Sequence, residues 1–306
     1  MEIKLKNKTI VVLGGAGFIG SNLINYLMEN TDFDVVSISR GNLPRSSPRL
    51  TEYCLDITLD NLFTTKINEL DILAFINCAG GGNVQESHQQ PHKDFYKTTA
   101  CTADILEYIR LNNLSSKYIQ LSSAAVYGNC FEFPISVDTI LKPMSAYGYN
   151  NLMAENLVSF YSTVYGVKAA VLRIFSVYGN GLKKQILWDA CLKMHQGNNS
   201  FFGTGQEVRD FINIDDLVGT IFNSIQFASD NAPIFNCGSG KGTKIYELLG
   251  YVQEHFNNLP KLKFSGEVKI GDPIGYIADI SKSPIEQTIK IDDGIANYVN
   301  WFKKEI

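Results

Sequence analysis

The sequence predicts an α/β protein with a doubly wound parallel sheet, followed by a smaller α/β domain. Two observations predict this fold. Up to about residue 175, short apolar runs alternate with longer segments of helical spacing, which is typical of parallel strands connected by helices. After residue 175, the helical and strand-like segments become richer in Gly and polar residues. We therefore expect a first domain over residues 1–175 and a second domain mainly over residues 176–306.

Each strand of the first domain is predicted from an apolar run without polar alternation, which indicates burial on both faces. These runs are residues 9–13, 35–38, 73–77, 118–121 and 169–174. Helices are predicted between them at residues 19–29, 95–111 and 147–165. A late run of the same kind makes a segment near residues 234–238 a candidate to return to the first sheet. Ligands of such sheets bind beyond the carboxyl ends of the strands, so we expect the site in those loops.

Composition limits the classes of function. The 306 residues carry a formal charge of −4, unlike the basic surfaces of general nucleic-acid or anionic-membrane binders. No signal-peptide or membrane-spanning pattern is present in the sequence. Six cysteines lie far apart without a C-x-x-C pair, which favours reduced thiols and a cytoplasmic location. His88 and His92 have a metal-ligand spacing, but Pro91 lies between them and no third ligand is near, so we predict no metal site.

The segment GGAGFIG follows the first predicted strand and leads into the first predicted helix. In a Rossmann-type fold Gly14 would permit the tight turn, Gly17 would admit the pyrophosphate of a dinucleotide, and Gly20 would let the helix pack on the strand. Phe18 and Ile19 lie at the helix N-terminus, which supplies amide donors to phosphates. The pattern predicts dinucleotide binding, and the alternative is a glycine-rich turn without a ligand.

The end of the second predicted strand distinguishes the two nicotinamide cofactors. An NAD site usually has an acidic residue there, which binds the ribose hydroxyls. This chain has Ser39 and Arg40 instead, and both can hydrogen-bond a 2′-phosphate that Arg also neutralises. We therefore expect NADP as the cofactor, with NAD as the alternative. The other interpretation of Arg40 is a solvated charge in a loop.

Together with further motifs, the chain resembles the extended short-chain dehydrogenase/reductase family, the NAD-dependent epimerase/dehydratases that act on nucleotide sugars. The matching segments are GGAGFIGSNL (14–23), CLDIT (54–58), SSAAVYG (122–128), PMSAYGYNN (143–151), LRIFSVYGNG (172–181) and GTGQEVRDFINIDDL (203–217). The resemblance implies a Rossmann-type cofactor domain, a smaller domain that closes over a nucleotide-sugar substrate, and a homodimer.

The resemblance also implies roles for individual residues. Ser123 and Tyr147 match the catalytic pair, in which the Tyr exchanges a proton with the sugar oxygen and the Ser hydroxyl holds that oxygen. Thr98 and Ser176 stand where the family commonly has Asn. The cofactor contacts implied are Asp56, Ile57, Cys78, Ala79, Gly80, Tyr147 and Asn151. The substrate contacts implied are Asn83, Ser123, Ala124, Tyr147, Ser176 and Arg209. Without the family context, Ser123 could be a strand end and Tyr147 a helix-start aromatic.

One catalytic position departs from the family pattern Y-x-x-x-K. Here the pattern ends at Asn151, so the ammonium that lowers the pKa of the Tyr is missing. At a separation of ~5 Å and an effective dielectric constant of about 20, that lost interaction is roughly 3 kcal/mol, or about two pKa units. We therefore expect Tyr147 to stay protonated and to retain a pKa near that of a free phenol.

The loss of the lysine affects the two directions of the reaction unequally. Alcohol oxidation needs Tyr147 as a base, whereas ketone reduction needs its proton, so reduction should suffer less. We hypothesise an NADPH-dependent reductase of a 4-keto nucleotide sugar. A 4-epimerase is the alternative within the family, and a 4,6-dehydratase is disfavoured because Ala124 and Ala125 replace its acidic pair. A catalytically weakened dinucleotide-binding protein is the alternative of another class.

Overall fold

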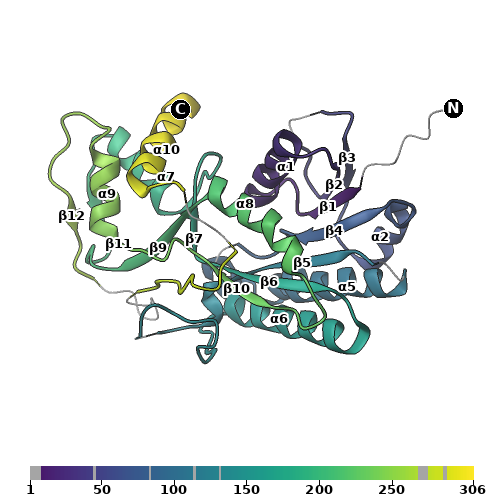
Figure 1. Cartoon of the computed structure of the whole chain (residues 1–306). Helices are drawn as coiled ribbons and strands as arrows, with labels where there is room; N and C mark the ends of the chain where they lie inside the picture. The colour runs from purple at the N-terminus through teal and green to yellow at the C-terminus, as the bar shows by residue number, and fades with distance from the viewer. Residues whose placement is uncertain are drawn as a thin grey trace. The chain divides into compact units, whose positions relative to one another are not determined.

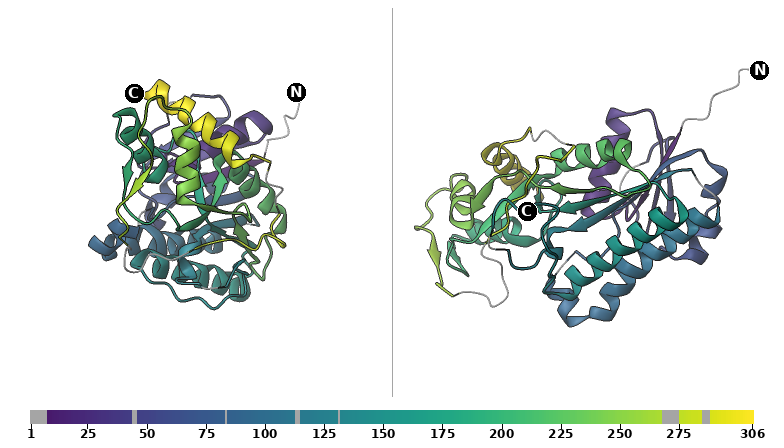
Figure 2. Two further views of the ribbon diagram at one scale, coloured as in Figure 1. Left: turned by 90° about the vertical axis from the view of Figure 1, so that its left-hand side faces the viewer. Right: turned by 60° about the horizontal axis from the view of Figure 1, so that its bottom comes forward.

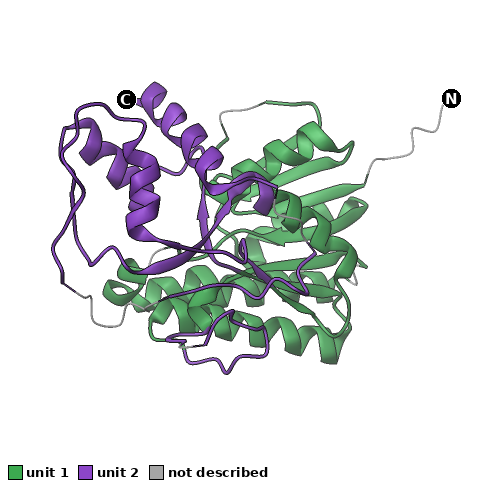
Figure 3. Cartoon of the chain, turned by 60° about the vertical axis from the view of Figure 1, so that its left-hand side comes forward, with its two compact units in different colours: residues 1–126, 143–173, 218–235 green, residues 127–142, 174–217, 236–306 purple. Residues whose placement is uncertain are grey.

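The computed structural model describes residues 8–306 except 44–45, 83, 113–114, 131, 268–274 and 285–287. The chain divides into two compact units (Figure 3): unit 1 contains residues 1–126, 143–173 and 218–235, and unit 2 contains residues 127–142, 174–217 and 236–306. One division falls near the expected boundary at 175. In addition, residues 127–142 belong to unit 2 and residues 218–235 to unit 1, so a single boundary describes the chain incompletely.

A seven-stranded sheet forms the centre of the predicted Rossmann-type fold (Figure 1). Its order is β10-β6-β5-β4-β1-β2-β3, and β1 pairs in parallel with both β2 and β4. The direction of winding changes between β1 and β4, where ligands bind in sheets of this class. The strands are β1 (Thr9–Leu13), β2 (Asp34–Ser39), β3 (Leu50–Cys54), β4 (Ile72–Asn77), β5 (Lys117–Ser123), β6 (Ala169–Ile174) and β10 (Ile234–Cys237).

Strand β3 is the one strand of this sheet that the apolar runs did not predict. It lies at the sheet edge beside β2, and none of its residues is buried. An edge strand can carry polar residues such as Thr51 and Glu52 because one of its sides faces solvent. The run of buried side chains that marks the inner strands is therefore missing.

Helices cover both faces of the sheet (Figures 1 and 2). Helix α1 (Phe18–Asn30) lies on one face, and α2 (Leu59–Thr64), α5 (Cys101–Leu111) and α6 (Ala146–Tyr165) lie on the other. The helix predicted over residues 95–111 consists of α4 (Pro91–Phe95), a π-helical segment η2 (Tyr96–Ala100) and α5. The remaining helical segments are α3 (Val84–Gln89), α8 (Ile214–Ser224) and the 3-10 turns η1 (Ile67–Glu69), η3 (Ala124–Val126) and η4 (Ile225–Phe227).

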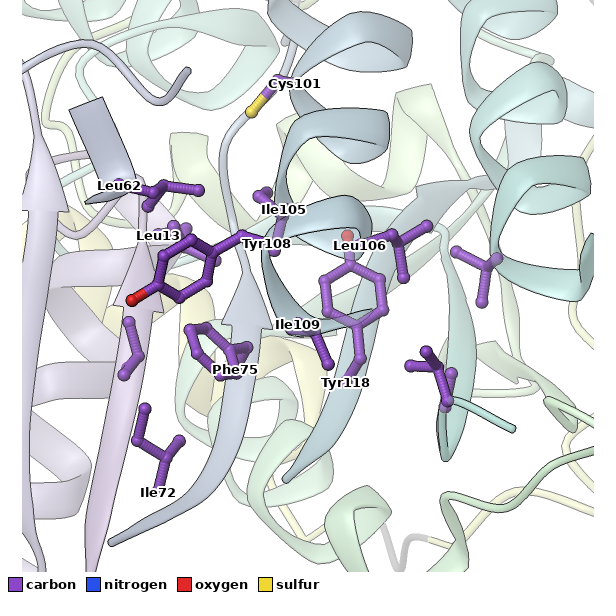
Figure 4. Close-up of a cluster of buried hydrophobic side chains, with 14 of the residues drawn as sticks. Leu13, Leu62, Ile72, Phe75, Cys101, Ile105, Leu106, Tyr108, Ile109 and Tyr118 are labelled. Carbon is purple, nitrogen blue, oxygen red and sulfur yellow. The ribbon is translucent and has the colours of Figure 1, made fainter. Parts of the chain in front are cut away.

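The core between the sheet and α5 consists of aliphatic and aromatic side chains (Figure 4). The rings of Phe75 and Tyr108 lie 6.3 Å apart in an edge-on arrangement, and Leu13 and Ile105 are fully buried. Each fully buried side chain of this size contributes about 1.5–3 kcal/mol. This packing fixes the ends of β1 and β4, from which the loops of the candidate site start.

The described residues of unit 2 include two small sheets and the helices α7 (Gln185–His195), α9 (Ile245–Gln253) and α10 (Ile291–Glu305). In the first sheet β9 (Val208–Asn213) pairs antiparallel with β11 (Gly242–Lys244) and parallel with β7 (Ser176–Tyr178). In the second, β12 (Lys263–Phe264) pairs with β8 (Ser200–Phe201). Across the described parts of both units, no helix has the length and apolar character needed to cross a bilayer.

Candidate active site

The glycine loop between β1 and α1 has the geometry that a pyrophosphate needs. Gly14 has a φ of +79°, and a Cβ there would lie 2.7 Å from the backbone nitrogen of Ala79. A Cβ on Gly20 would collide with the carbonyl oxygen of Gly14. Gly17 is the N-cap of α1, and no described side chain caps this helix, so its first amides can donate to phosphate oxygens. Half-buried Phe18 and Ile19 begin the helix, so the five predicted residues lie together at the turn from β1 into α1.

The loop after β4 lies against the glycine loop, and the side chain of Asn77 supports its backbone. The Asn77 side-chain oxygen accepts a hydrogen bond from the Ala79 N–H (3.1 Å), while its amide donates to the Tyr118 hydroxyl (3.0 Å) and to Gln120 (3.2 Å). These three side chains are buried. Sequence reasoning missed Asn77; its signal is an amide at the end of the otherwise apolar run LAFIN.

Two predicted cofactor contacts, Cys78 and Gly80, lie in that loop. Cys78 donates its backbone N–H to the Leu13 carbonyl oxygen (2.8 Å), which joins the ends of β4 and β1. Burial raises the pKa of the Cys78 thiol to about 12, so it stays a neutral thiol at physiological pH. Gly80 has a φ of +154°, a conformation that L residues rarely adopt.

Ser39 and Arg40 take different roles at the end of β2. The buried Ser39 hydroxyl accepts a hydrogen bond from the Ala16 N–H (3.3 Å) and donates one to the Gly41 carbonyl oxygen (2.8 Å). It thus supports the glycine loop, which differs from the expectation that Ser39 would bind a 2′-phosphate. The exposed Arg40 Nε lies 3.5 Å from the Asp56 carboxylate, so Arg40 is the group at this strand end that can bind an anion.

Asp56 and Ile57 follow the edge strand β3. The Asp56 side chain is 69% exposed, and the half-buried Ile57 packs against the core cluster. The ion pair between Asp56 and Arg40 brings the two side chains together just beyond the paired ends of β3 and β2. A ligand adenosine would therefore find a carboxylate and a guanidinium side by side, whose balance matters for 2′-phosphate binding.

Tyr147 lies in the first turn of α6, whose start is fixed by two serines. The Ser145 hydroxyl caps the helix by accepting the Gly148 N–H (3.1 Å), as expected of an N-cap residue. The hydroxyl of Ser87, which lies on α3, accepts the Tyr147 N–H (3.1 Å). Ser87 is buried and was not predicted, because its role depends on α3 packing against α6.

Ser123 and Tyr147 come together as the family pattern predicts. A Cβ on Gly148 would lie 2.7 Å from the Ala125 carbonyl oxygen, so the absence of a side chain lets α6 approach the segment after β5. Ser123 is then close enough to the Tyr147 phenol to lower its pKa. Ala124 is buried beside it in η3. The arrangement offers a hydroxyl and a phenol to one substrate oxygen.

Asn151 is one helical turn after Tyr147 and is buried, with 4% exposure. Its side-chain amide donates a hydrogen bond to the Tyr147 carbonyl oxygen (2.8 Å), and the same side chain has a lowering effect on the pKa of the phenol. The pair is therefore neutral where the family has a lysine. Asn151 turns back onto its own helix, which is possible because Asn is much shorter than Lys.

The pKa of Tyr147 is raised above its usual value near 10, mainly because burial disfavours the phenolate. The side chains of Ser123 and Asn151 oppose the rise, while the negative charge of Asp94 adds to it. The sequence predicted a phenol near its free value; the structure moves it further in the same direction. Tyr147 is therefore an acid at neutral pH.

Thr98 replaces the family Asn and contacts the loop after β4. Its buried hydroxyl accepts the Gly81 N–H (3.0 Å). The next residue, Thr99, donates its hydroxyl to the Asn150 carbonyl oxygen (3.2 Å) in α6. Asn83, predicted as a substrate contact, lies outside the described residues.

In unit 2, Ser176 and Arg209 lie on neighbouring strands, β7 and β9. The half-buried Arg209 donates to the Val208 carbonyl oxygen (2.9 Å), and its guanidinium lies 6.0 Å from the centre of the Tyr276 ring. Beside it, buried Asp210 accepts the Ser239 hydroxyl at 2.6 Å. This network fixes β9 and so positions Arg209.

Unit 2 also has a shallow hollow that the sequence did not predict. Its volume is about 340 Å³, and it is lined by Ser200, Phe201, Phe202, Lys263, Phe264 and Ser265. Phe202 is 57% exposed, and Lys193 lies over the Phe201 ring at 5.1 Å. An exposed ring beside cations can stack on a nucleobase or another flat ring.

All six cysteines are free thiols, and Cys54 is the exposed one. Within the described residues, no three His, Cys, Asp or Glu side chains are grouped as ligands for a metal ion.

Comparisons with known proteins identify the family. The model of the NAD dependent epimerase/dehydratase family matches residues 10–238. A UDP-glucose 4-epimerase of Streptococcus mutans is 31% identical over 301 residues, covering 90% of this chain and 89% of that protein. A dTDP-4-dehydro-6-deoxyglucose reductase of Escherichia coli is 28% identical over 308 residues, covering 94% and 95%. The structure of a Bacillus cereus UDP-glucuronic acid 4-epimerase with UDP-glucuronic acid and NAD has a TM-score of 0.82 at 24% identity, covering 97% and 100% of the two chains, and shares the fold. This chain belongs to the NAD dependent epimerase/dehydratase family.

Proposed function

We propose that the protein is an NADPH-dependent reductase of a 4-keto nucleotide sugar. The observation that carries the proposal is the Ser123–Tyr147 pair without a cation, in which Asn151 replaces the family lysine and the pKa of Tyr147 is raised. Such a phenol is protonated at neutral pH and can donate its proton. Ser123 would hold the substrate oxygen that receives it.

The residues around the pair fit a bound nicotinamide dinucleotide. Its role when bound is to supply the hydride for the carbonyl carbon. The glycine loop and the N-terminus of α1 would bind the pyrophosphate, and the loop after β4, held by Asn77, would run beside it. Tyr147 would donate its phenolic proton to the former carbonyl oxygen and regain one from solvent.

The raised pKa separates the two directions of reaction. With a pKa above about 10, fewer than one phenol in about a thousand is ionised at pH 7. Alcohol oxidation at neutral pH needs that ionised fraction, whereas ketone reduction uses the protonated majority. Reduction is therefore the direction that this site supports.

We propose NADPH rather than NADH because the cation Arg40 lies at the end of β2. Position 39, where an NAD site usually has an acidic residue, is a serine. Asp56, 3.5 Å from Arg40, opposes this choice because its carboxylate would repel a 2′-phosphate. Arg40 is exposed, so it can leave Asp56 and bind the phosphate with two N–H groups. NAD remains the alternative cofactor.

The nucleotide part of the substrate would use unit 2. The Arg209 guanidinium suits a diphosphate, and Ser176 lies on the neighbouring strand. The hollow around Phe201 and Phe202 offers an aromatic surface for the base. These residues belong to one unit, so a nucleoside diphosphate without a sugar should bind and raise the melting temperature.

The deciding experiment measures both directions with one enzyme preparation. dTDP-4-dehydro-6-deoxyglucose and other nucleotide 4-keto sugars are offered with NADPH, and UDP-glucose and UDP-glucuronic acid with NADP and NAD. We expect NADPH consumption with a keto sugar and little alcohol oxidation at pH 7. Tyr147→Phe should lower kcat by about 10²–10⁴-fold without weakening NADPH binding. Fast oxidation of an alcohol at pH 7 would refute the proposal.

A 4-epimerase is the second candidate, favoured by the 31% identity to a UDP-glucose 4-epimerase. An epimerase must oxidise and then reduce the same carbon, so it needs Tyr147 as base and acid in turn. A catalytically weakened cofactor-binding protein would show neither reaction. Product analysis of UDP-glucose and UDP-glucuronic acid after long incubation identifies an epimerase, and the assay with keto sugars and NADPH separates a reductase from an inactive cofactor-binding protein.

We also propose a homodimer formed through α6. Four exposed side chains follow one side of this helix at spacings of four, seven and four: Tyr149, Met153, Phe160 and Val164. Exposed Tyr96 lies in η2, which packs against α6. An apolar stripe with bulky residues along its length can pair with a second copy of itself across a two-fold axis.

A further inference from the structure

A π-helical segment interrupts the long helix that packs against α6. Segment η2 (Tyr96–Ala100) joins α4 to α5. A π turn contains one extra residue, so it changes the direction of the side chains that follow it, and such turns are frequent at functional sites. Thr98 reaches the backbone of Gly81 and Thr99 reaches the backbone of Asn150. One short segment therefore contacts both the loop after β4 and the catalytic helix.

Asp94, just before η2, connects the same two elements through a carboxylate. It is 6% exposed, and its Oδ2 accepts a hydrogen bond from the side-chain amide of Asn150 (2.6 Å). A Cβ on Gly81 would collide with its Oδ1, so the carboxylate packs directly against the loop after β4. Asn150 is three residues after Tyr147, and residues at this spacing lie on the same side of a helix.

The charge of Asp94 is poorly screened. A carboxylate this deeply buried acts through a medium of lower dielectric constant than water, so its field reaches further. It contributes to the raised pKa of Tyr147, after the larger effect of burial. Of the described groups that shift the pKa of this phenol, Asp94 is the charged one.

The other titratable groups on the elements packed against α6 are paired, exposed or directed elsewhere. On α3, α4 and η2, Glu86 pairs with Lys93 and Lys97, and both His88 and His92 are exposed. On α5, Glu107 pairs with Arg110, and Asp104 interacts with Leu59 and Asp60 of α2. On β5, Lys117 bonds the Gln226 carbonyl oxygen, and on α6 itself Glu155 pairs with Arg173.

We propose that Asp94 is a positioning residue for Tyr147, which holds the first turn of α6 through Asn150 and places a buried negative charge behind that turn. The proposal takes its chemical meaning from the proposed reductase function. Where the family lysine would draw the proton off the tyrosine, this chain has a neutral Asn151 and a carboxylate behind the same turn. Asp94 thus acts in the direction of ketone reduction.

The test follows the Tyr147 phenol itself. The full-length protein is labelled with ¹³C at the tyrosine ring carbon that bears the hydroxyl, and Tyr147→Phe assigns its resonance. Asp94→Asn keeps the shape and can still accept from Asn150, but removes the charge. Glu86→Gln is the matched control, because it removes a half-exposed, ion-paired carboxylate from α3, which packs against α4 and α6. We expect ionisation of Tyr147 at lower pH in Asp94→Asn and no change in the control.

Kinetics provide a second readout. In Asp94→Asn the alkaline limit of ketone reduction should move to lower pH, and kcat should fall about tenfold or more with KM for the keto sugar unchanged. A merely structural role would lower the melting temperature without moving the pH limit. An unmoved ionisation of Tyr147 in a folded Asp94→Asn protein would overturn the proposal.

A charge exchange keeps the proposal testable if Asp94→Asn does not fold. The double variant Asp94→Asn with Asn150→Asp retains one carboxylate and one amide in the pair, and places the charge on the helix that carries Tyr147. We expect ionisation of Tyr147 at or above the pH seen in the natural protein, and ionisation at lower pH would overturn the proposal. The titration needs no substrate, so a protein that reduces no keto sugar but shows the Asp94 effect refutes only the proposed function.

Discussion

The side-chain amide of Asn151 donates a hydrogen bond to the carbonyl oxygen of Tyr147, 2.8 Å away, one turn earlier in the same helix. Asn151 therefore places a neutral amide at the position where the family has a lysine. Since burial already raises the pKa of Tyr147, the site has no described cation that lowers it again. That balance supports ketone reduction as the proposed direction of the reaction.

Restoring the lysine should reverse the preference. In Asn151→Lys an ammonium near the phenol favours the phenolate and lowers the pKa of Tyr147. Alcohol oxidation, which rises with pH as the phenolate forms, should then rise at lower pH, and its rate at pH 7 should increase by about tenfold or more. The measurement is the pH profile of NADP reduction by the nucleotide sugar product. Asn151→Gln is the neutral control; an equal gain there would show that charge is not the cause.

The raised pKa of Tyr147 also predicts the pH profile of the natural enzyme. A group with a raised pKa keeps its proton further into the alkaline range, so the reductive kcat should stay level between about pH 6 and pH 9 and fall only at higher pH. Steady-state NADPH consumption at saturating substrate measures this. A fall centred near pH 7 would instead require a phenol with a lowered pKa, contrary to the environment of Tyr147.

Arg40 and Asp56 should control the choice of cofactor in opposite directions. Removing the guanidinium in Arg40→Ala should weaken NADPH binding by about 10- to 100-fold, the effect of a charged hydrogen bond to phosphate, and leave NADH binding nearly unchanged. Asp56→Asn should strengthen NADPH binding, because it removes both the competing partner of Arg40 and a repelling charge. Calorimetric titration with each cofactor measures these effects. Equal losses for both cofactors in Arg40→Ala would show that Arg40 does not bind the 2′-phosphate.

Arg173 and Glu155 form a buried ion pair, with 3% and 4% of their side chains exposed, and Glu155 also accepts the Ser122 hydroxyl at 2.5 Å. Removing one partner leaves an uncompensated charge, so Glu155→Gln should lower the free energy of unfolding by about 3–5 kcal/mol. The double variant with Arg173→Met should recover part of that loss. Urea unfolding measures both. A single variant as stable as the natural protein would mean that water reaches the site after substitution.

The sequence was sufficient for parts of the fold and site that depend on local pattern. Gly14 is favoured by its positive φ and Gly20 by the nearby carbonyl oxygen of Gly14, and the inner strands carry continuous apolar runs. The roles of Asn77, Ser87 and Asp94 could not be predicted, because each depends on which elements lie side by side. The role of Ser39 could not be predicted for the same reason, because its hydroxyl forms hydrogen bonds with the backbone of Ala16 and Gly41. Edge strand β3 lacked the buried run that marks the others.

The exposed stripe of α6 leads to a prediction about assembly. Val164 is 57% exposed, so Val164→Glu should change the stability of the monomer by no more than about 0.5 kcal/mol. In a dimer that buries this position, the unpaired carboxylates would weaken association by at least about 100-fold in Kd. Sedimentation over a range of concentrations measures the change. Ile140→Glu, at a residue 75% exposed in unit 2, is the control, because a general effect of added charge would appear in both variants. A natural protein that stays monomeric at all concentrations would leave the stripe of α6 without the role proposed for it.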